Sequence, residues 1–210
     1  MTPDLRVLVV CTANVCRSRT AELLLRQRLS AAGVAAEVSS AGVRAVAGAP
    51  PCAVMATLLR QRDLALDPAL GARRASRELL AEHDLVLVPE RAHRTALARL
   101  LPTGRGRTFT FLEAAALADA LPAGGDAVGS GRDRLLGRVR WMNRARGTVE
   151  LPGAVDPGRG GWVRGPLFGR RPVSDPFDVA DVHGGSPREH DAALTVIDES
   201  LDRLVRGLTR

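Results

Sequence analysis

An apolar run near the N-terminus ends abruptly in a polar loop, and a helical pattern follows at once. The run covers residues 7–10, and the octet after it reads Cys11-Thr12-Ala13-Asn14-Val15-Cys16-Arg17-Ser18. Four consecutive apolar residues are typical of a strand that is buried on both faces. Residues 18–32 have the pattern of an amphipathic helix that stops at Gly33. We therefore expect a strand, a tight loop and a helix in immediate succession.

The loop carries a cysteine and, six positions later, an arginine. Backbone N–H groups point inward in a loop of this kind, and the positive end of the helix dipole adds to their potential. An anion is stabilised there, and so is a cysteine thiolate. An arginine can hold two oxygens of a bound oxyanion with its planar fork. Although free cysteines are often inert core residues, this combination indicates transfer of a phosphoryl group to Cys11, with Arg17 binding the phosphate.

Short apolar runs alternate with helical patterns along the rest of the chain. Further strands are expected over residues 34–39, 85–88 and 107–111, and helices over 53–62, 76–82 with Ser76 as the cap, 92–101, 112–121 and 187–206. This alternation is typical of βαβ units and predicts an α/β fold with a four-stranded parallel sheet flanked by helices. The length predicts a single domain over residues 1–210. Ligands of such sheets bind beyond the carboxyl ends of the strands, where the octet lies.

The octet, its early position and three later segments occur in an order that resembles the low-molecular-weight protein tyrosine phosphatases. The later segments are Ser39-Ser40-Ala41-Gly42, Asp84-Leu85-Val86-Leu87-Val88 and Asp175-Pro176-Phe177. The resemblance covers residues 5–117 and 173–208. It implies an enzyme that hydrolyses phosphotyrosine in proteins through a phosphocysteine intermediate. Its partner would be a tyrosine-phosphorylated protein, and no cofactor or metal would be needed.

The resemblance also implies a role for each residue of the site. Cys11 is expected to attack phosphorus, Arg17 to stabilise the phosphate oxygens, and the Ser18 hydroxyl to donate to the Cys11 sulfur. Asp175, with its backbone fixed by Pro176, is the expected general acid, and Asp178 and Asp181 are nearby competitors. The loop residues expected to bind the phosphate are Thr12, Ala13, Asn14, Val15, Cys16, Arg17 and Ser18.

Cys16 has two interpretations. It is either a small apolar filler or, as the resemblance implies, a partner that forms a reversible disulfide with Cys11 under peroxide.

The chain also departs from the family pattern, and these departures spare the catalytic set but bear on phosphotyrosine preference. Ala13 stands where a glycine is usual, Arg19 where a proline is frequent, Arg73 or Arg74 where many members have a histidine, and Val43 and Val46 where many have an aromatic wall.

Residues 122–172 differ in character from the rest of the chain. Glycine and arginine dominate, and one helical pattern over residues 133–146 contains Trp141 and Met142. A loop this long is unusual inside a compact domain. We favour a partly disordered surface insertion over a flap beside the active site, although the segment ends directly before Asp175-Pro176.

The charge of the chain narrows the choice of partner. All 30 basic residues are arginines, and the net charge is +7. The arginines are scattered, without interleaved aromatic residues or a recognition motif. This pattern disfavours nucleic acid and is compatible with phosphorylated or acidic protein segments.

Other features argue against several classes of protein. Three cysteines do not make a disulfide scaffold, and the N-terminal residues do not have the pattern of a signal peptide. Apolar stretches fall short of the roughly 20 residues that span a bilayer, so a cytoplasmic protein without membrane contact is expected. The four histidines, His83, His93, His183 and His190, do not have the spacing of metal ligands.

Three other functions remain open. An arsenate reductase coupled to thioredoxin shares the loop but needs two further cysteines in series, and no cysteine follows Cys52. A protein-arginine phosphatase of the same fold carries threonine at the position of Val15, where a β-branched apolar residue fits the tyrosine phosphatases better. A non-catalytic phosphopeptide-binding module is expected to lack the nucleophile or the acid, whereas Cys11 and Asp175 are both present.

Overall fold

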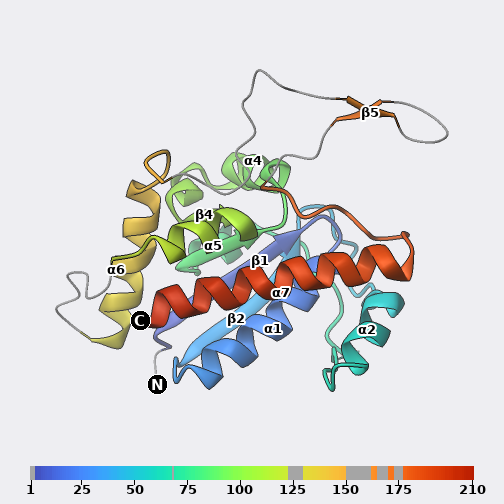
Figure 1. Ribbon diagram of the computed structural model, residues 1–210, viewed down its shortest axis with the longest axis horizontal. Coiled ribbons are helices and arrows are strands. Elements are labelled where there is room, and N and C mark those ends of the chain that lie inside the picture. The colour runs from blue at the N-terminus through green and yellow to red at the C-terminus, as the bar shows by residue number, and fades with distance from the viewer. Residues whose placement is uncertain (1–2, 68, 123–129, 150–161, 165–169, 173–176) are drawn as a thin grey trace.

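A four-stranded parallel sheet forms the centre of the molecule, as predicted (Figure 1). The computed structural model describes residues 3–67, 69–122, 130–149, 162–164, 170–172 and 177–210. The strands are β1 (Leu5–Cys11), β2 (Ala36–Gly42), β3 (Leu85–Val88) and β4 (Thr108–Thr110), and their order across the sheet is β2-β1-β3-β4. Because β1 pairs with β2 in a register that sets Cys11 beside Gly42, both strands end at the same edge of the sheet.

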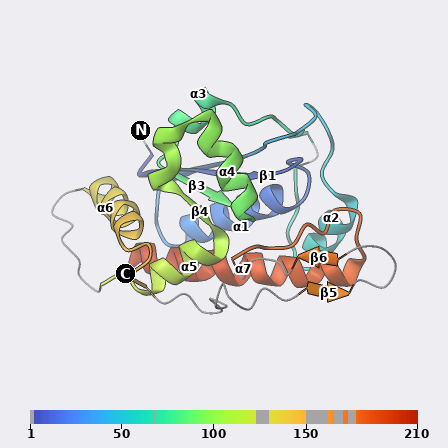
Figure 2. The same ribbon diagram turned by 90° about the horizontal axis from the view of Figure 1, so that it is seen from above.

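Helices cover both faces of this sheet. They are α1 (Arg17–Ala31), α2 (Ala53–Arg60), α3 (Arg77–Ala81), α4 (Arg91–Leu100), α5 (Phe111–Asp119), α6 (Gly131–Arg144) and α7 (Pro187–Thr209), with a 3₁₀ turn over Pro102–Arg107. Figure 2 shows α3 and α4 on one side of the sheet and α5 and α7 on the other. The elements appear in the predicted order, with ends that differ from the prediction by a few residues.

The two central strands, β1 and β3, divide their side chains between two hydrophobic clusters. In β1, Val7 and Val9 belong to the larger cluster, and Leu8 and Val10 belong to the smaller one. Side chains alternate between the faces of a strand, so a strand covered by helices on both faces must be apolar at every position. This requirement explains the unbroken apolar run in the sequence.

The helix inside the expected insertion is part of the core, not of a surface insertion. Leu135, Val139 and Met142 of α6 are buried in the larger hydrophobic cluster, and Met142 is completely inaccessible. Arg132 also forms a two-pronged ion pair with Asp84 at the start of β3, with distances of 2.9 and 3.1 Å. Apolar burial of this kind stabilises a domain, so residues 130–149 belong to the folded unit.

Two short strands, β5 (Trp162–Arg164) and β6 (Arg170–Pro172), pair antiparallel later in the same segment. Within the described parts of the chain, no helix has the length and apolar character required to cross a bilayer.

Candidate active site

The loop between β1 and α1 curls back on itself at the edge of the sheet. Asn14 adopts a positive φ of 59°, a conformation that asparagine tolerates better than most residues. Gly42, at the end of β2, lies directly against the loop. A Cβ atom there would come within 2.6 Å of the Thr12 carbonyl oxygen and 2.8 Å of the Asn14 nitrogen. Only glycine therefore lets the second strand support the loop this closely.

Two hydrogen bonds reach the Cys11 sulfur. The backbone N–H of Asn14 donates to Sγ at 3.3 Å, and the hydroxyl oxygen of Ser18 lies 3.0 Å from Sγ. Ser18 Oγ also accepts a hydrogen bond of 2.9 Å from the side-chain amide of Asn14. Because that amide fills the acceptor side of the hydroxyl, the Ser18 proton is free to point at the sulfur. Both contacts direct hydrogen-bond donors at the sulfur atom.

The Asn14 side chain organises a larger polar network under the loop. Its amide nitrogen donates to Ser40 Oγ at 2.8 Å, and its oxygen accepts from the backbone N–H of Arg73 at 2.9 Å. Ser40 in turn donates to Glu22 at 2.5 Å. Asn14 is only 1% exposed, so this network satisfies its polar atoms and fixes the direction of every hydrogen bond up to Cys11.

The Arg17 guanidinium is buried beside the same loop. It is 2% exposed and forms an ion pair of 3.0 Å with Asp181, a second ion pair with Glu90, and a hydrogen bond of 2.9 Å to the Val179 carbonyl oxygen. A buried guanidinium requires such partners. They hold the planar group in one orientation at the edge of the sheet, where it can bind two oxygens of a phosphate.

His93 of α4 closes another side of the loop. Its Nε2 lies 2.9 Å from the Thr12 hydroxyl, and the side chain is buried. Burial lowers the pKa of His93 below the ordinary histidine value, and the Glu90 carboxylate opposes that shift. A neutral imidazole therefore faces Thr12 at neutral pH.

These features can be compared with those of known proteins. Residues 6–118 match the family model described as low molecular weight phosphotyrosine protein phosphatase. The chain belongs to this family. It is 37% identical over 105 residues to the low molecular weight protein-tyrosine-phosphatase Etp of Escherichia coli K12, covering 50% of this chain and 68% of that protein. It is 39% identical over 106 residues to Wzb of Salmonella typhimurium, with the same coverage of 50% and 68%.

Solved structures of other phosphatases have the same fold. The tyrosine phosphatase AmsI of Erwinia amylovora matches with a TM-score of 0.64 at 20% identity, covering 100% of this chain and 95% of AmsI. The YwlE arginine phosphatase of Geobacillus stearothermophilus matches with a TM-score of 0.59 at 21% identity, covering 96% and 91%. The fold is therefore shared by phosphatases that act on two different kinds of phosphorylated residue.

The octet predicted from the sequence forms one loop around the Cys11 sulfur. The predicted acid, Asp175, is far from this loop in the sequence. Asp175 and Pro176 fall outside the described residues, so the role of Asp175 stays a prediction. Of its competitors, Asp178 accepts a hydrogen bond of 2.8 Å from the backbone N–H of Arg91, and Asp181 pairs with Arg17. Sequence reasoning missed Glu90 and His93, although Glu90 follows β3 by two residues, at the edge where ligands of parallel sheets bind.

Two arginines that depart from the family pattern form hydrogen bonds near the loop. Arg19, where a proline is frequent, donates to the Asp67 carbonyl oxygen at 3.0 Å and to the Leu70 carbonyl oxygen, and so ties α1 to the segment before α3. Arg73, at the place of a frequent histidine, bonds to Asn14 and also donates to the Ser40 carbonyl oxygen at 2.7 Å. Val46, which stands where many members have an aromatic wall, is 74% exposed.

Cys16 faces a different environment from Cys11. Its sulfur lies near the thiol of Cys52 and the imidazole of His190. Burial raises the pKa of the Cys16 thiol above its ordinary value, and the neighbouring Cys52 raises it further. The disulfide between Cys16 and Cys11 stays a prediction.

Proposed function

We propose that this phosphatase hydrolyses phosphotyrosine in proteins through a phosphocysteine intermediate. The observation that carries the proposal is the pair of hydrogen bonds to the Cys11 sulfur, from Asn14 N–H and the Ser18 hydroxyl, next to the buried Arg17 guanidinium. A stabilised thiolate supplies the nucleophile, and a fixed guanidinium supplies the binding site for two phosphate oxygens. Membership of the family supports the same chemistry.

In the first step, the Cys11 sulfur forms a bond to phosphorus while the bond from phosphorus to the phenolic oxygen breaks. Arg17 and the backbone N–H groups of residues 12–18 stabilise the three other phosphate oxygens as their charge changes. Asp175 gives a proton to the departing oxygen, so the product leaves as a neutral phenol. General acid catalysis of this kind contributes about 10²–10⁴-fold.

In the second step, a water oxygen attacks phosphorus and the bond from sulfur to phosphorus breaks. Cys11 leaves as a thiolate, to which the Ser18 hydroxyl donates its hydrogen bond. Asp175, now a carboxylate, accepts the proton that the water loses. Inorganic phosphate and the starting form of the enzyme result.

The described residues after Asp175 support its assignment as the acid. Phe177 is buried with the Arg91 guanidinium 4.6 Å from its ring centre, and the Val179 carbonyl oxygen accepts from Arg17. Asp175 lies four residues before Val179, and such a span reaches at most about 14 Å. In the proposed mechanism, this short link of chain lets Asp175 serve the same site as Arg17.

Two observations favour phosphotyrosine over phosphoarginine. The curated relatives at 37% and 39% identity are named as protein-tyrosine-phosphatases. Val15 occupies the loop position at which arginine phosphatases of this family carry threonine, and its side chain is 92% buried, with 8% exposed. The proposed partner is therefore a tyrosine-phosphorylated protein.

A kinetic comparison of three peptides tests this proposal. The peptides share one sequence and carry phosphotyrosine, phosphoserine or phosphoarginine, and the readout is kcat/KM for phosphate release. We expect phosphotyrosine to be preferred by at least about 100-fold, a transition-state difference of about 2.7 kcal/mol. A preference for phosphoarginine would overturn the substrate class, and arsenate-dependent oxidation of thioredoxin would overturn the reaction.

Trapping the intermediate tests the mechanism separately. After rapid acid quench during turnover of the phosphotyrosine peptide, mass spectrometry should find phosphate on Cys11. The Cys11→Ser variant should bind inorganic phosphate, because the loop remains, but should not turn over. A Cys11→Ser variant that keeps more than a few per cent of the activity would contradict the assigned nucleophile.

A further inference from the structure

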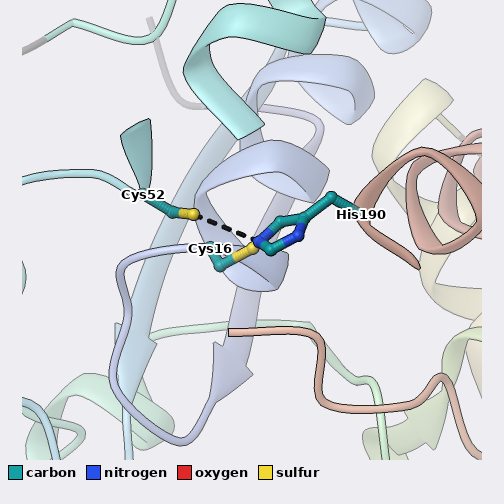
Figure 3. A group of neighbouring side chains, drawn as sticks. All are labelled: Cys16, Cys52 and His190. Carbon is teal, nitrogen blue, oxygen red and sulfur yellow. Dashed lines mark hydrogen bonds between the residues drawn. The ribbon is translucent and has the colours of Figure 1, made fainter. Parts of the chain in front are cut away.

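A second group of reactive side chains lies beside the phosphate-binding loop. Figure 3 shows Cys16, Cys52 and His190 pointing toward one another from three different parts of the chain. Cys16 precedes α1, Cys52 precedes α2, and His190 lies near the start of α7. Their sulfur and ring nitrogen atoms all lie within 4.8 Å of one another, and all three side chains are buried. We call this group the thiol cluster.

The imidazole of His190 is oriented by its other nitrogen. Nδ1 lies 2.9 Å from the Ser186 carbonyl oxygen, which can only accept, so Nδ1 carries the proton. Nε2 then presents a lone pair to the Cys52 sulfur at 3.3 Å. Ser186 is itself fixed by a reciprocal pair of hydrogen bonds with Glu189 that caps α7. A histidine that donates through one nitrogen to a carbonyl oxygen has the arrangement found at metal sites.

We propose that Cys16, Cys52 and His190 bind a transition metal ion of the zinc class. Two thiolates and one imidazole are ligands that zinc prefers. With bonds of about 2.3 Å to sulfur and about 2.0 Å to nitrogen, the ligand atoms of a tetrahedral zinc ion lie roughly 3.4–3.8 Å apart. The contact of 3.3 Å between Cys52 and His190 is slightly shorter than this spacing, so a small outward shift of the two side chains would admit the ion.

An open groove gives the ion a way in and a fourth ligand. The groove has a volume of about 480 Å³, and its lining includes Cys52 and His190 of the cluster and the exposed His183. Three protein ligands with one position open to water is a common coordination for zinc. A water molecule from the groove completes the tetrahedron in this proposal.

The position of His190 favours a metal ion over a disulfide between the two cysteines. A disulfide would join the sulfurs of Cys16 and Cys52 and remove the thiol proton that His190 Nε2 accepts. The buried Nε2 atom would then lose its hydrogen-bond donor, which destabilises the folded chain. A metal ion uses all three groups and leaves none of them unsatisfied.

The exchange of protons balances the charge of the proposed site. Each thiol loses one proton to solvent when the ion binds, and an imidazole that carries its one proton on Nδ1 loses none. A divalent ion with two thiolates is electrically neutral, which suits a buried position. A buried Cys16 thiolate needs a positive charge beside it, and the bound ion supplies that charge.

The proposed ion would connect the phosphate-binding loop to two distant helices. Cys16 belongs to the loop, and the Cys52 backbone N–H donates to the Val15 carbonyl oxygen at 2.7 Å. Cys52 and His190 are 138 positions apart in the sequence, so a bound ion would cross-link α2 and α7 beside the loop. It would stabilise the folded chain in proportion to its concentration and affinity.

A cobalt titration of the full chain tests the proposal without using phosphatase activity. The protein carries Cys11→Ser to remove the other reactive thiol, is freed of metal by a chelator and is kept reduced without oxygen. Added Co²⁺ should give the near-ultraviolet charge-transfer absorption of cobalt bound to thiolate, and Zn²⁺ should abolish it. In lightly buffered solution, proton release should correspond to the two thiols.

Variants of two ligands complete the test. In the same background, Cys52→Ser and His190→Asn should each weaken cobalt binding by at least about 100-fold. Circular dichroism serves as the control for folding. If either variant fails to fold, native mass spectrometry of the Cys11→Ser chain decides, because zinc should add its mass less two protons. Unchanged affinity in both folded variants, a cobalt spectrum without charge transfer, or zinc binding without proton loss would overturn the proposal.

Discussion

Cys11 and Cys16 lie on one loop, yet their sulfur atoms meet opposite surroundings. Cys11 receives hydrogen bonds from Asn14 and Ser18 and lies in the loop that Arg17 closes. Cys16 lies among a second thiol and an imidazole that offers only a lone pair. One environment supplies hydrogen-bond donors to its sulfur, whereas the other supplies electron pairs and, in our proposal, suits a metal ion. The difference shows that the chemistry of a cysteine is set by the elements behind it and not by its position in a motif.

The sharpest test of this contrast exchanges each sulfur for oxygen. Cys11→Ser should reduce turnover by at least about 10⁴-fold, because the hydroxyl is a far weaker nucleophile. Cys52→Ser should leave turnover within about threefold of the parent, because its backbone hydrogen bond to Val15 is retained. Steady-state kinetics with a phosphotyrosine peptide measures both. Equal losses in the two variants would mean that the two sulfurs are not functionally separate.

Arg17→Lys tests the anion-binding side alone. A lysine is a point charge that cannot hold two oxygens in the fixed geometry of a guanidinium, so kcat should fall by about 10²–10³-fold. Arg19→Lys is the matched control, because Arg19 donates to backbone carbonyl oxygens and not to the loop. Arg19→Lys should lower the thermal stability and should alter kcat by less than about threefold. Similar losses of kcat in both variants would show that the effect is structural.

Substrates with different leaving groups distinguish the role of Asp175, the proposed acid, from that of Asp181, the ion-pair partner of Arg17. Asp175→Asn should slow phosphotyrosine hydrolysis by about 10²-fold and slow p-nitrophenyl phosphate less, because that phenol departs without protonation. Asp181→Asn should change both substrates by the same factor, since Asp181 contacts Arg17. If Asp181→Asn or Asp178→Asn shows the dependence on leaving group instead, the acid lies a few residues later than proposed.

His93 should give the smallest effect, on stability and not on rate. Because burial holds its pKa below the ordinary value of about 6.5, the unfolded chain binds a proton at higher pH than the folded chain does. The stability contributed by neutral His93 is therefore present above about pH 6.5 and is lost as the pH falls through the lowered pKa. Between about pH 7.5 and about pH 5.5, denaturant unfolding should show a smaller loss of unfolding free energy in His93→Gln than in the parent protein. An identical loss in both proteins would contradict this expectation.

Local signals in the sequence predicted much of the fold and half of the site. The apolar runs of β1 and β3, the cap at Ser76 and the loop from Cys11 to Ser18 were all visible, because each depends on residues close together in the chain. The supporting strand was expected over residues 34–39, whereas β2 runs over Ala36–Gly42. Strands, helix caps and tight loops depend on local backbone conformation, which a short stretch of sequence largely determines.

The rest depends on contacts between distant segments. Glu90 and Asp181 reach Arg17 from two other parts of the chain, and the thiol cluster draws on residues without regular spacing. The expectation of a surface insertion was wrong for α6, because its apolar face, with Met142, is interrupted by arginines and glycines and only the packed structure shows what it covers. The position of Asp175 stays a prediction.

The ion pairs of Arg17 have a consequence for how fast the enzyme can finish a cycle. A phosphate that binds the guanidinium competes with Asp181, whose side chain is 50% exposed and can swing toward solvent. In the proposed cycle, a carboxylate that returned to Arg17 as inorganic phosphate departed would act as an internal competitor. Competition of this kind would lower the affinity for substrate and product alike. It would therefore speed product release, the step that limits many well-evolved enzymes.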